Sequence, residues 1–257
     1  MDKVISIIMP AHNAEAHIQT AIDSVLAQSL RDFELLVLDD CSTDQTLKRI
    51  QAYSDPRIRL YVLANNLGAA ETRNYGIRQA KGRYIAFLDS DDCWKPEKLA
   101  LQLAFMREHK VALSYTAYDV MSPDGKHITG HVNVPESVTY RYLLRNTIIG
   151  CLTVMIDTNQ TGLVQMPAFK GAEDTATWLS ILKTGHIAKG LTVPLAVYRK
   201  GNVSLSSNKF QMAQHIWQVY RKSQHMSVFI ALTHFPFYLW NGLVKHLRTG
   251  GSVKLMK

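Results

Sequence analysis

A short apolar run that leads directly into a cluster of carboxylates most constrains this chain. Residues 84–88 read Tyr-Ile-Ala-Phe-Leu, a pattern typical of a buried β-strand, and Asp89, Asp91 and Asp92 follow at once. Such carboxylates are stable when a cation lies against them, and hard divalent metals prefer carboxylate oxygens. Open α/β sheets bind their ligands at the carboxyl ends of their strands. The sequence therefore predicts an enzyme that handles a nucleotide diphosphate with the help of a divalent metal.

The first hundred residues alternate between strand and helix patterns. Runs of strand type cover residues 4–9, 34–38, 58–63 and 84–88. Helical patterns cover residues 14–28, 42–53, 69–80 and 96–109. This alternation predicts an α/β fold with a mostly parallel, Rossmann-like sheet that helices flank.

The rest of the chain is less regular. We expect strands at residues 111–118, 152–156 and 187–198, and helices at residues 139–145, 173–183 and 208–224. Residues 227–247 are mostly apolar and contain Pro236.

Charge is distributed unevenly along the chain. Residues 1–174 contain all 21 Asp and Glu with 18 of the Lys and Arg, whereas residues 175–257 contain 11 Lys and Arg and no acid. A basic C-terminal part favours an anionic partner, either anionic lipid or nucleic acid. The three cysteines lack metal-ligand spacing, which favours reduced thiols in a cytoplasmic setting.

Polar residues follow three of the predicted strands, namely residues 10–13, 39–40 and 89–92. The carboxyl ends of parallel strands lie at one edge of a sheet, so we expect these groups to converge on one ligand. There Asp40 suits a base imide or a ribose hydroxyl, and Arg73 suits a base or a phosphate. Taken singly, each acidic group also fits a polar turn that caps a helix.

Together these segments resemble the family-two inverting glycosyltransferases, which share the GT-A fold. The resemblance is carried by Val4–Glu15, Leu38–Asp44, Thr72–Gly76 and Phe87–Asp92, and it extends to about residue 205. The stretch from Tyr198 to Lys209 resembles bacterial envelope-polysaccharide transferases, including the teichuronic acid, O-antigen and capsule types. The resemblance implies a nucleotide-sugar donor, usually UDP-linked, and Mg²⁺ or Mn²⁺ on the Asp-x-Asp motif.

The resemblance also assigns residues to the donor. It implies that Asp40 contacts the uracil, that Asp89 and Ser90 contact the ribose and diphosphate, and that Asp91 binds the metal together with Asp89. The other nucleotide contacts that it implies are Pro10, Ala11, Asn13, Glu15, Asn66 and Arg73. Thymidine stays open as the base, because the Asp40 contact serves uridine and thymidine alike.

An acidic pair before an apolar helix, Glu173-Asp174, resembles the segment that carries the family's catalytic base. The resemblance implies that Asp174 takes the proton of the acceptor hydroxyl, and that Glu173 and Trp178 contact or orient the acceptor. A carboxylate within hydrogen-bond reach helps a sugar hydroxyl to attack. From the residues alone, Asp174 fits equally a first-turn acid that the helix dipole favours. Attack in one displacement inverts the anomeric configuration.

This reading divides the chain into a GT-A domain at residues 1–207 and a C-terminal extension at residues 208–257. Within the domain, residues 1–110 form the nucleotide-binding half and residues 111–207 the acceptor-binding half. Residues 226–244 contain no Lys, Arg, Asp or Glu, but His234, Pro236, Asn241 and Gly242 interrupt the apolar run. Dense aromatic residues with flanking Arg and Lys favour contact with a membrane surface. Packing on the catalytic core or on a second subunit, and a membrane span, are the alternatives.

We therefore predict a metal-dependent transferase that moves a sugar from a UDP-sugar to a hydroxyl of a glycan or lipid-linked acceptor. It would act in bacterial cell-surface polysaccharide synthesis, in the cytoplasm and peripheral on the inner face of the membrane, without nucleic acid. An oligomer stays open. The rival hypothesis is a decayed transferase that binds membranes without catalysis.

Three other enzyme classes fit less well. A phosphohydrolase would want Thr or Val where Asp92 stands, and a pyrophosphorylase would want a Gly-rich phosphate loop where residues 10–15 stand. A Rossmann dehydrogenase would want Gly-x-Gly-x-x-Gly after a strand, and the sequence has none.

Overall fold

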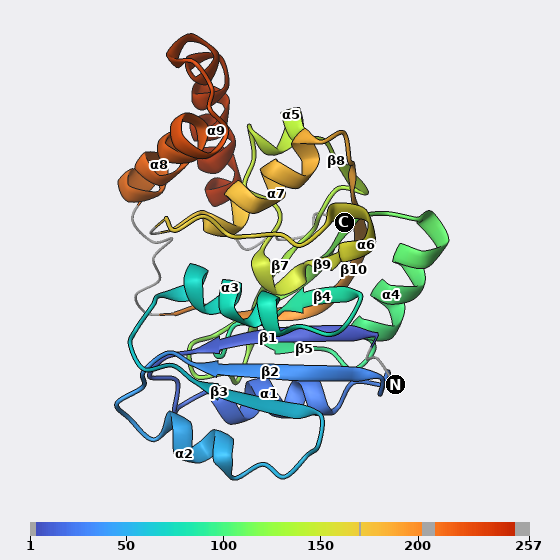
Figure 1. The fold of residues 1–257 in the computed structure, drawn as a ribbon. Coiled ribbons are helices and arrows are strands. Elements are labelled where there is room, and N and C mark those ends of the chain that lie inside the picture. The colour runs from blue at the N-terminus through green and yellow to red at the C-terminus, as the bar shows by residue number, and fades with distance from the viewer. Residues whose placement is uncertain (1–3, 170, 202–208, 250–257) are drawn as a thin grey trace, which may run out of the picture.

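A twisted, mixed sheet forms the centre of the computed structural model, which describes residues 4–169, 171–201 and 209–249 (Figure 1). Within these residues the sheet has ten strands, and its main path runs β3-β2-β1-β4-β9-β6-β10-β5. Two further strands lie off this path, where β7 pairs with β6 and β8 pairs with β10. Helices cover both faces of the sheet, as the sequence predicts.

The first four strands are parallel to one another, which confirms the predicted alternation. The strands are β1 (Ile5–Ala11), β2 (Phe33–Asp39), β3 (Ile58–Val62) and β4 (Tyr84–Phe87). The helices between them are α1 (Ile18–Leu26), α2 (Thr46–Gln51) and α3 (Ala69–Gln79). The pairs β1–β2, β2–β3 and β1–β4 are all parallel. Their carboxyl ends therefore lie at one edge of the sheet.

Beyond β4 the sheet becomes mixed. Strand β9 is antiparallel to both β4 and β6, whereas β6 and β10 are parallel to each other. The strands of this half are β5 (Cys93–Trp94), β6 (Leu113–Met121), β7 (Ile128–Val132), β8 (Ser137–Val138), β9 (Met155–Asp157) and β10 (Ala188–Arg199). The helices are α4 (Lys98–His109), α5 (Tyr140–Leu143), α6 (Thr158–Thr161) and α7 (Glu173–Lys183).

Several boundaries differ from the sequence-based expectation. The predicted strand at residues 152–156 begins instead as a 3₁₀ turn, Cys151–Thr153, and becomes a strand only at Met155. The short strands β5, β7 and β8 were not predicted, because two have only two residues and β7 is largely exposed. Helix α2 begins at Thr46 rather than residue 42, since the polar residues before it bind neighbouring loops.

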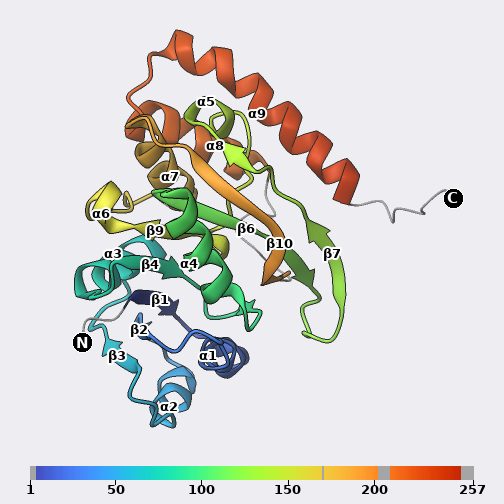
Figure 2. The ribbon, with the colours of Figure 1, turned by 90° about the vertical axis from the view of Figure 1, so that its right-hand side faces the viewer.

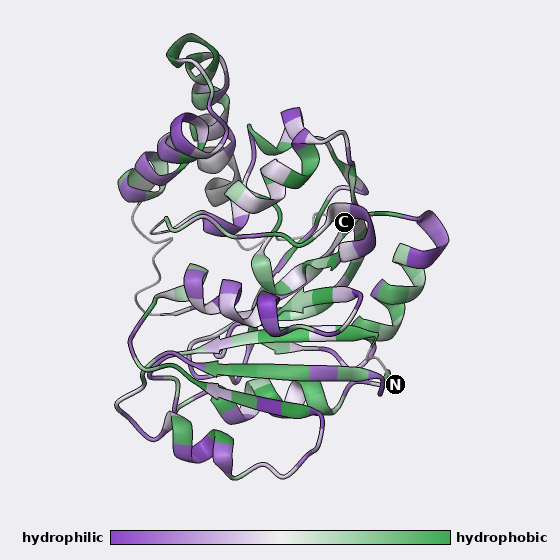
Figure 3. Cartoon of the chain, viewed as in Figure 1, coloured by the Kyte–Doolittle hydropathy of each residue, from purple (hydrophilic) through white to green (hydrophobic). Residues whose placement is uncertain are grey.

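The apolar runs of the central strands are continuous because both faces of the sheet are covered. In β1, Ile5, Ile7 and Met9 belong to the core on one face, whereas Ile8 belongs to the core on the other. All four side chains are fully buried. Figure 3 shows the strands of this part of the sheet coloured mainly as hydrophobic. A parallel sheet with two covered faces favours such runs over alternation.

The C-terminal extension packs against the second half of the α/β domain. It consists of α8 (Lys209–Gln218), a π-helical turn (Val219–Ser223) and the long α9 (Val228–Thr249). Figure 2 shows α9 as a rod along the outside of the molecule. Ile216, Tyr220 and Tyr238 are buried members of the same apolar core as α7. Of the three sequence-based alternatives for the extension, packing on the catalytic core is thus present in the structure.

The sequence also left a membrane span open for this part of the chain, and it placed a domain boundary at residue 207. Among the helices that the structure describes, none is long and apolar enough to cross a membrane. The expected domain boundary at residue 207 lies outside the described residues.

Hydrogen bonds between polar groups join the amino-terminal ends of β1 and β2 to the turn before β4. The hydroxyl of Ser6 donates to Glu34 (2.7 Å) and accepts a hydrogen bond from the N–H of Gly82 (2.8 Å). Arg59 pairs with the same Glu34 carboxylate at 2.8 Å. A Cβ atom built on Gly82 would lie 2.6 Å from the backbone nitrogen of Ser6. The turn before β4 can therefore approach β1 only because residue 82 is glycine.

We predict that Gly82→Ala lowers the free energy of unfolding by about 3 kcal/mol, because the added methyl group overlaps the backbone of β1. Urea unfolding followed by circular dichroism measures the loss. Gly130→Ala in β7 is the matched control, since its Cβ would lie 4.0 Å from the nearest atom, in Val120. Equal stability of the two variants would show that the close approach at Gly82 does not constrain the fold.

Candidate active site

The loops at the carboxyl ends of β1 and β2 and the loop before α3 are joined by hydrogen bonds. Asn13 Oδ1 accepts one from the N–H of Thr43 at 2.8 Å. The carboxylate of Asp40 accepts two, from the N–H groups of Leu67 (2.7 Å) and Gly68 (2.9 Å). The first two of the three predicted strand-end groups thus lie side by side. The third, at residues 89–92, follows the neighbouring strand β4.

Asp40 holds a loop in this structure. Its side chain is buried, and each carboxylate oxygen accepts one backbone hydrogen bond from the turn before α3. An ionised carboxylate has about four acceptor positions, so some remain for a ligand. The predicted contact of Asp40 with a base stays a prediction.

Asn13 and Glu15 likewise bind the protein itself. Glu15 Oε2 accepts a hydrogen bond from the N–H of Gln45 at 2.9 Å, and Asn13 has a left-handed backbone with φ of 48°. Both residues shape the loops that precede α1 and α2. Of the other predicted nucleotide contacts, Ala11 is buried, Pro10 and Ser90 are half-buried, and Asn66 is exposed.

His12 is a site residue to which the sequence assigned no role. Its Nδ1 lies 2.7 Å from the carbonyl oxygen of Asp40 and 3.2 Å from the amide nitrogen of Asn66. The imidazole therefore joins the first strand end to the loop before α3. The sequence feature that could have identified His12 is its position among residues 10–13, which follow the first predicted strand.

Arg73 connects the two halves of the domain. Its side chain is only 7% exposed, and its guanidinium lies 2.5 Å from Asp89 Oδ1 and 3.0 Å from Glu173 Oε1. Asp89 follows β4, whereas Glu173 begins α7. The sequence predicted that Arg73 reaches a base or phosphate, but here both terminal nitrogens contact carboxylates of the protein. Its main structural role is therefore to hold Asp89 and Glu173 close together.

Three carboxylates crowd the end of β4. The protein atoms around Asp91 and the charge of Asp89 raise the pKa of Asp91. Burial and the same neighbouring charges raise the pKa of Asp92 well above its usual range. Asp92 accepts a hydrogen bond from the N–H of Arg199 at 2.7 Å. This cluster is short of positive charge and would be stabilised by a cation.

The carboxylate oxygens at this cluster suit a divalent metal that is also coordinated by a bound ligand. Asp89 Oδ2 and the exposed side chain of Asp91 offer hard oxygen donors, while Asp89 Oδ1 is bound to Arg73. In the part of the chain that the structure describes, no three His, Cys, Asp or Glu side chains form a ready-made metal centre. The arrangement suits Mg²⁺ or Mn²⁺ that keeps further ligands from diphosphate or water.

Arg199 is a second residue whose role the sequence missed. Its Nε donates to the carbonyl oxygen of Asp91 at 2.9 Å, and its Nη1 lies 3.2 Å from the carbonyl oxygen of Pro123. It therefore fixes the backbone of the carboxylate turn against the turn after β6. The sequence feature that could have identified Arg199 is the Tyr-Arg pair at the end of the last predicted strand.

Asp174 lies in the first turn of α7, next to the pair of Arg73 and Glu173. Burial and the charge of Glu173 raise the pKa of Asp174 to about 6. Its Oδ1 accepts a hydrogen bond from the N–H of Thr175 at 2.6 Å. A carboxylate with this pKa is ionised at neutral pH and is still basic enough to accept a proton.

The backbone before Asp174 is unusual. Gly171 and Ala172 both adopt positive φ, of 83° and 63°. A Cβ on Gly171 would lie 2.5 Å from Nδ1 of His215 in α8. The extension thus packs directly against the turn that presents Asp174.

Trp178 is fully buried, and its predicted contact with an acceptor stays a prediction. Its ring packs against Phe87 of β4, with a centroid distance of 5.8 Å. The side chain thus packs α7 against β4. An orienting effect through α7 stays a prediction.

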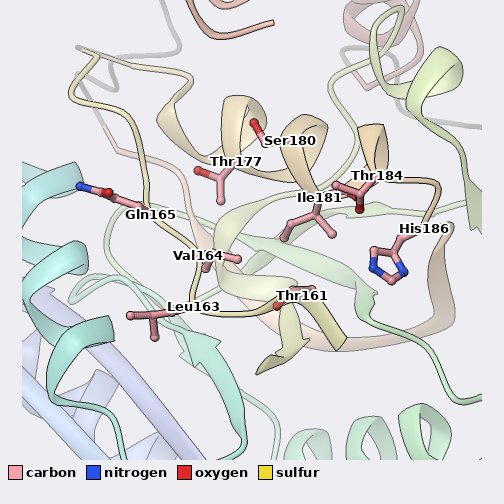
Figure 4. A pocket seen from close by; sticks show the side chains of 9 residues that line it. All are labelled: Thr161, Leu163, Val164, Gln165, Thr177, Ser180, Ile181, Thr184 and His186. Carbon is pink, nitrogen blue, oxygen red and sulfur yellow. The ribbon is translucent and has the colours of Figure 1, made fainter. Parts of the chain in front are cut away.

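A hollow of about 160 Å³ lies along α7, one to three turns beyond Asp174 (Figure 4). The residues that line it are mostly hydroxyl-bearing or apolar: Thr161, Leu163, Val164, Gln165, Thr177, Ser180, Ile181, Thr184 and His186. It contains none of the site carboxylates, so we place the candidate active site at the strand ends and not in this hollow.

The comparisons with known proteins agree with this arrangement. The model of glycosyl transferase family 2 matches residues 6–166, which contain all three strand-end groups. The chain belongs to glycosyl transferase family 2. As a family 2 enzyme it is a glycosyltransferase.

Two curated relatives are similar over most of their length. A Bacillus subtilis protein named as a teichuronic acid biosynthesis glycosyltransferase, TuaG, is 46% identical over 246 residues, which cover 95% of this chain and 98% of the relative. The Escherichia coli protein WfgD is 41% identical over 219 residues, 85% of each chain. WfgD is named as a UDP-Glc:α-D-GlcNAc-diphosphoundecaprenol β-1,3-glucosyltransferase.

Two solved structures share the fold. The Staphylococcus aureus transferase TarS, residues 1–349 in complex with UDP-GlcNAc, has a TM-score of 0.70 at 22% identity, covering 98% of this chain and 76% of TarS. The mannosyltransferase PcManGT of Pyrobaculum calidifontis, with GDP-Man and Mn²⁺, has a TM-score of 0.66 at 20% identity, covering 98% of this chain and 77% of PcManGT. The expected GT-A fold is thus confirmed for this family 2 enzyme.

We predict that Arg73→Met lowers the free energy of unfolding by about 3–5 kcal/mol, because it leaves Asp89 and Glu173 crowded without their cation. Urea unfolding at neutral pH measures the loss.

Arg83→Met is the matched control for this substitution. Arg83 makes two hydrogen bonds to the Asp157 carboxylate, at 2.8 and 2.7 Å, but half of its side chain is exposed and Asp157 keeps other partners. It should cause a smaller loss. A loss at Arg73 no larger than the loss at Arg83 would contradict the electrostatic explanation.

Proposed function

We propose that this protein is an inverting glycosyltransferase of bacterial cell-surface polysaccharide synthesis. It would transfer a sugar from a nucleotide donor, with UDP as the first choice, to a hydroxyl of a glycan or lipid-linked acceptor. The observation that carries the proposal is the placement of Asp174. Asp174, whose pKa is raised, directly follows Glu173, and Arg73 pairs with both Glu173 and Asp89. A proton acceptor would therefore lie next to the diphosphate site that we propose.

The donor side is supported by charge and by the relatives. Asp89 and Asp91 place negative charge at the strand ends, and a divalent metal there would neutralise it while holding the diphosphate of the donor. WfgD is named for a UDP-Glc donor, and TarS was solved with UDP-GlcNAc. We therefore assign the donor site to the edge formed by β1, β2 and β4.

Mg²⁺ or Mn²⁺ held by Asp91 and Asp89 would neutralise the charge that grows on the departing nucleoside diphosphate. Arg73 keeps the Asp89 carboxylate in place and keeps its Oδ2 free for this task. Arg199 holds the backbone of the same turn.

Asp174 would take the proton from the acceptor hydroxyl as that oxygen attacks the anomeric carbon. Thr175 directs one oxygen of the Asp174 carboxylate through its N–H. Glu173 is held by Arg73, so it supplies negative charge beside Asp174 and raises its basicity. One displacement with a single base inverts the anomeric configuration, and it needs no carboxylate nucleophile.

The rival hypothesis of a decayed, non-catalytic transferase makes opposite predictions. The raised pKa values of Asp91 and Asp174 both reduce stability without a ligand, and perturbed carboxylates of this kind cluster at functional sites. We therefore favour the active enzyme, and donor binding decides between the two.

We predict that one UDP-sugar stabilises the protein against heat in the presence of Mn²⁺ or Mg²⁺ and not with EDTA. Asp91→Asn should abolish this stabilisation, because it removes a metal-binding charge. Differential scanning fluorimetry with UDP-, dTDP- and GDP-sugars measures the effect and identifies base and sugar. Asp124→Asn, in the exposed turn after β6, is the control that should bind normally. If no donor stabilises the protein, the non-catalytic rival is favoured.

We predict that Asp174→Asn lowers kcat about a thousandfold while donor stabilisation persists, because only the proton acceptor is lost. The wild-type rate should fall as pH drops through about 6, where Asp174 becomes protonated. Because folding raises this pKa, the ionised form opposes folding at neutral pH, and Asp174→Asn should therefore raise the Tm there. Rates, melting curves and the anomeric configuration of the product by NMR measure these effects. Retention of the donor configuration would contradict the mechanism.

A further inference from the structure

Helix α9 exposes an apolar face to solvent. Phe229 is 83% exposed and Trp240 is 67% exposed, although both are large and apolar. The other exposed apolar side chains of this helix are Val228, Ile230, Leu232, Phe237 and Leu239. At 100° per residue these side chains cover about 200° of the helix circumference, centred on Phe229 and Trp240, and we call this the outer face of α9. The first turns of α9 are coloured as hydrophobic in Figure 3.

The opposite side of α9 is packed on the protein. Ala231 and Tyr238 are buried there, and Asn241 Nδ2 donates to the carbonyl oxygen of Arg145 at 3.0 Å. The guanidinium of Arg145 lies 4.4 Å from the ring centroid of Phe237, at the border of the two sides. These contacts fix the rotation of α9, so its outer face cannot turn inward. A surface helix of a protein free in water has the reverse pattern, with polar residues outside.

The length and composition of the outer face indicate surface contact. None of the described helices qualifies as a membrane span. A helix with one aromatic-rich face and nearby basic residues lies in the plane of a lipid interface. Phenylalanine and tryptophan are the side chains that enter the boundary between headgroups and acyl chains most readily.

The charges near α9 indicate that the partner of its outer face is an anionic lipid surface. Arg221 and Lys222, in the turn just before α9, are exposed, and no Asp or Glu occurs after residue 174. The outer face itself contains no acidic residue that would repel anionic headgroups. A second copy of this chain is less suitable, because a symmetric dimer through the same patch would bring like charges together.

We propose that α9 docks flat on an anionic phospholipid bilayer, with its outer face inserted below the headgroups and Arg221 and Lys222 on the lipid phosphates. The proposal extends the proposed function and does not depend on it, because docking needs no donor. If the acceptor is lipid-linked, docking would also set the height of the active site above the membrane.

The connection to the active site is direct. Gln224, between the π-helical turn and α9, accepts a hydrogen bond from Lys183 of α7 through its carbonyl oxygen (2.8 Å). Its side chain lies within 3.4 Å of the carbonyl oxygen of Ala176 and the hydroxyl of Ser180, both in α7. The helix that presents Asp174 and the helix that docks are thus parts of one packed unit.

Flotation of the full chain with liposomes tests the proposal. We expect binding to vesicles of phosphatidylcholine with phosphatidylglycerol, weaker binding at high salt, and little binding to phosphatidylcholine alone. Phe229→Ser with Trp240→Ser should weaken binding about tenfold or more, because both inserted side chains are lost. The control is Val62→Ser with Leu163→Ser, which removes apolar side chains that are 55% and 66% exposed elsewhere. It should bind like the wild type.

Tryptophan fluorescence gives a second, local readout. Trp94 and Trp178 are buried and Trp217 is half-buried, so quenching by brominated lipids should come mainly from Trp240 and disappear in Trp240→Phe. Donor hydrolysis and Tm should be unchanged in the docking variants, which shows that they fold.

Two outcomes would overturn the proposal. One is equal vesicle binding by the docking variants and the wild type. The other is no vesicle binding together with a dimer mass by light scattering that Trp240→Ser reduces to that of a monomer, which would assign the outer face to a second copy. Loss of donor hydrolysis with normal vesicle binding would refute the proposed function alone.

Discussion

The contact of Arg73 with Asp89 and Glu173 is the interaction on which the site depends. One buried guanidinium pairs with a carboxylate that follows β4 and with another that begins α7, at 2.5 and 3.0 Å. Without this cation the carboxylates around β4 and α7 would repel one another in a poorly solvated place. Because it is shared, the position of α7 relative to β4 is fixed, and Asp174 is held near the carboxylates at the end of β4. Burial and the neighbouring carboxylate charges raise the pKa of Asp174 to about 6 and also raise the pKa of Asp91.

The extension contributes to this arrangement from the other side of α7. His215 packs against Gly171 in the turn before Asp174, and Gln224 contacts the backbone of α7. The general base that we propose therefore lies on a helix held by Arg73 at its beginning and by the extension along its length. A sugar acceptor attached to a lipid would approach along the side where α9 exposes its outer face. Through α7, the base that we propose is thus connected to the helix that we propose for surface attachment.

Much of the fold could be predicted from periodicity. Strands β1, β2 and β4 are buried on both faces, so their apolar runs are unbroken and unambiguous. Strands β5 and β8 could not be predicted, because two-residue strands have no pattern of their own. In the site, the acids at residues 89–92 and 173–174 could be identified by their position after a strand and before a helix. Trp178 could not be placed, because an aromatic residue next to an acidic pair fits both a buried core and a sugar-binding site.

The sequence by itself determined the alternation of strands and helices, the carboxylates at the strand ends and the basic, acid-free C-terminal part. These are local patterns, and local patterns are set by spacing along the chain. Only the tertiary structure decided that Arg73 spans Asp89 and Glu173, because its partners lie 16 and 100 residues away in the chain. Only the tertiary structure decided which side of α9 is buried, since an apolar helix can pack any of its sides. Long-range packing selects among the contacts that local chemistry permits, and here that selection placed Asp174 near the carboxylates at the end of β4.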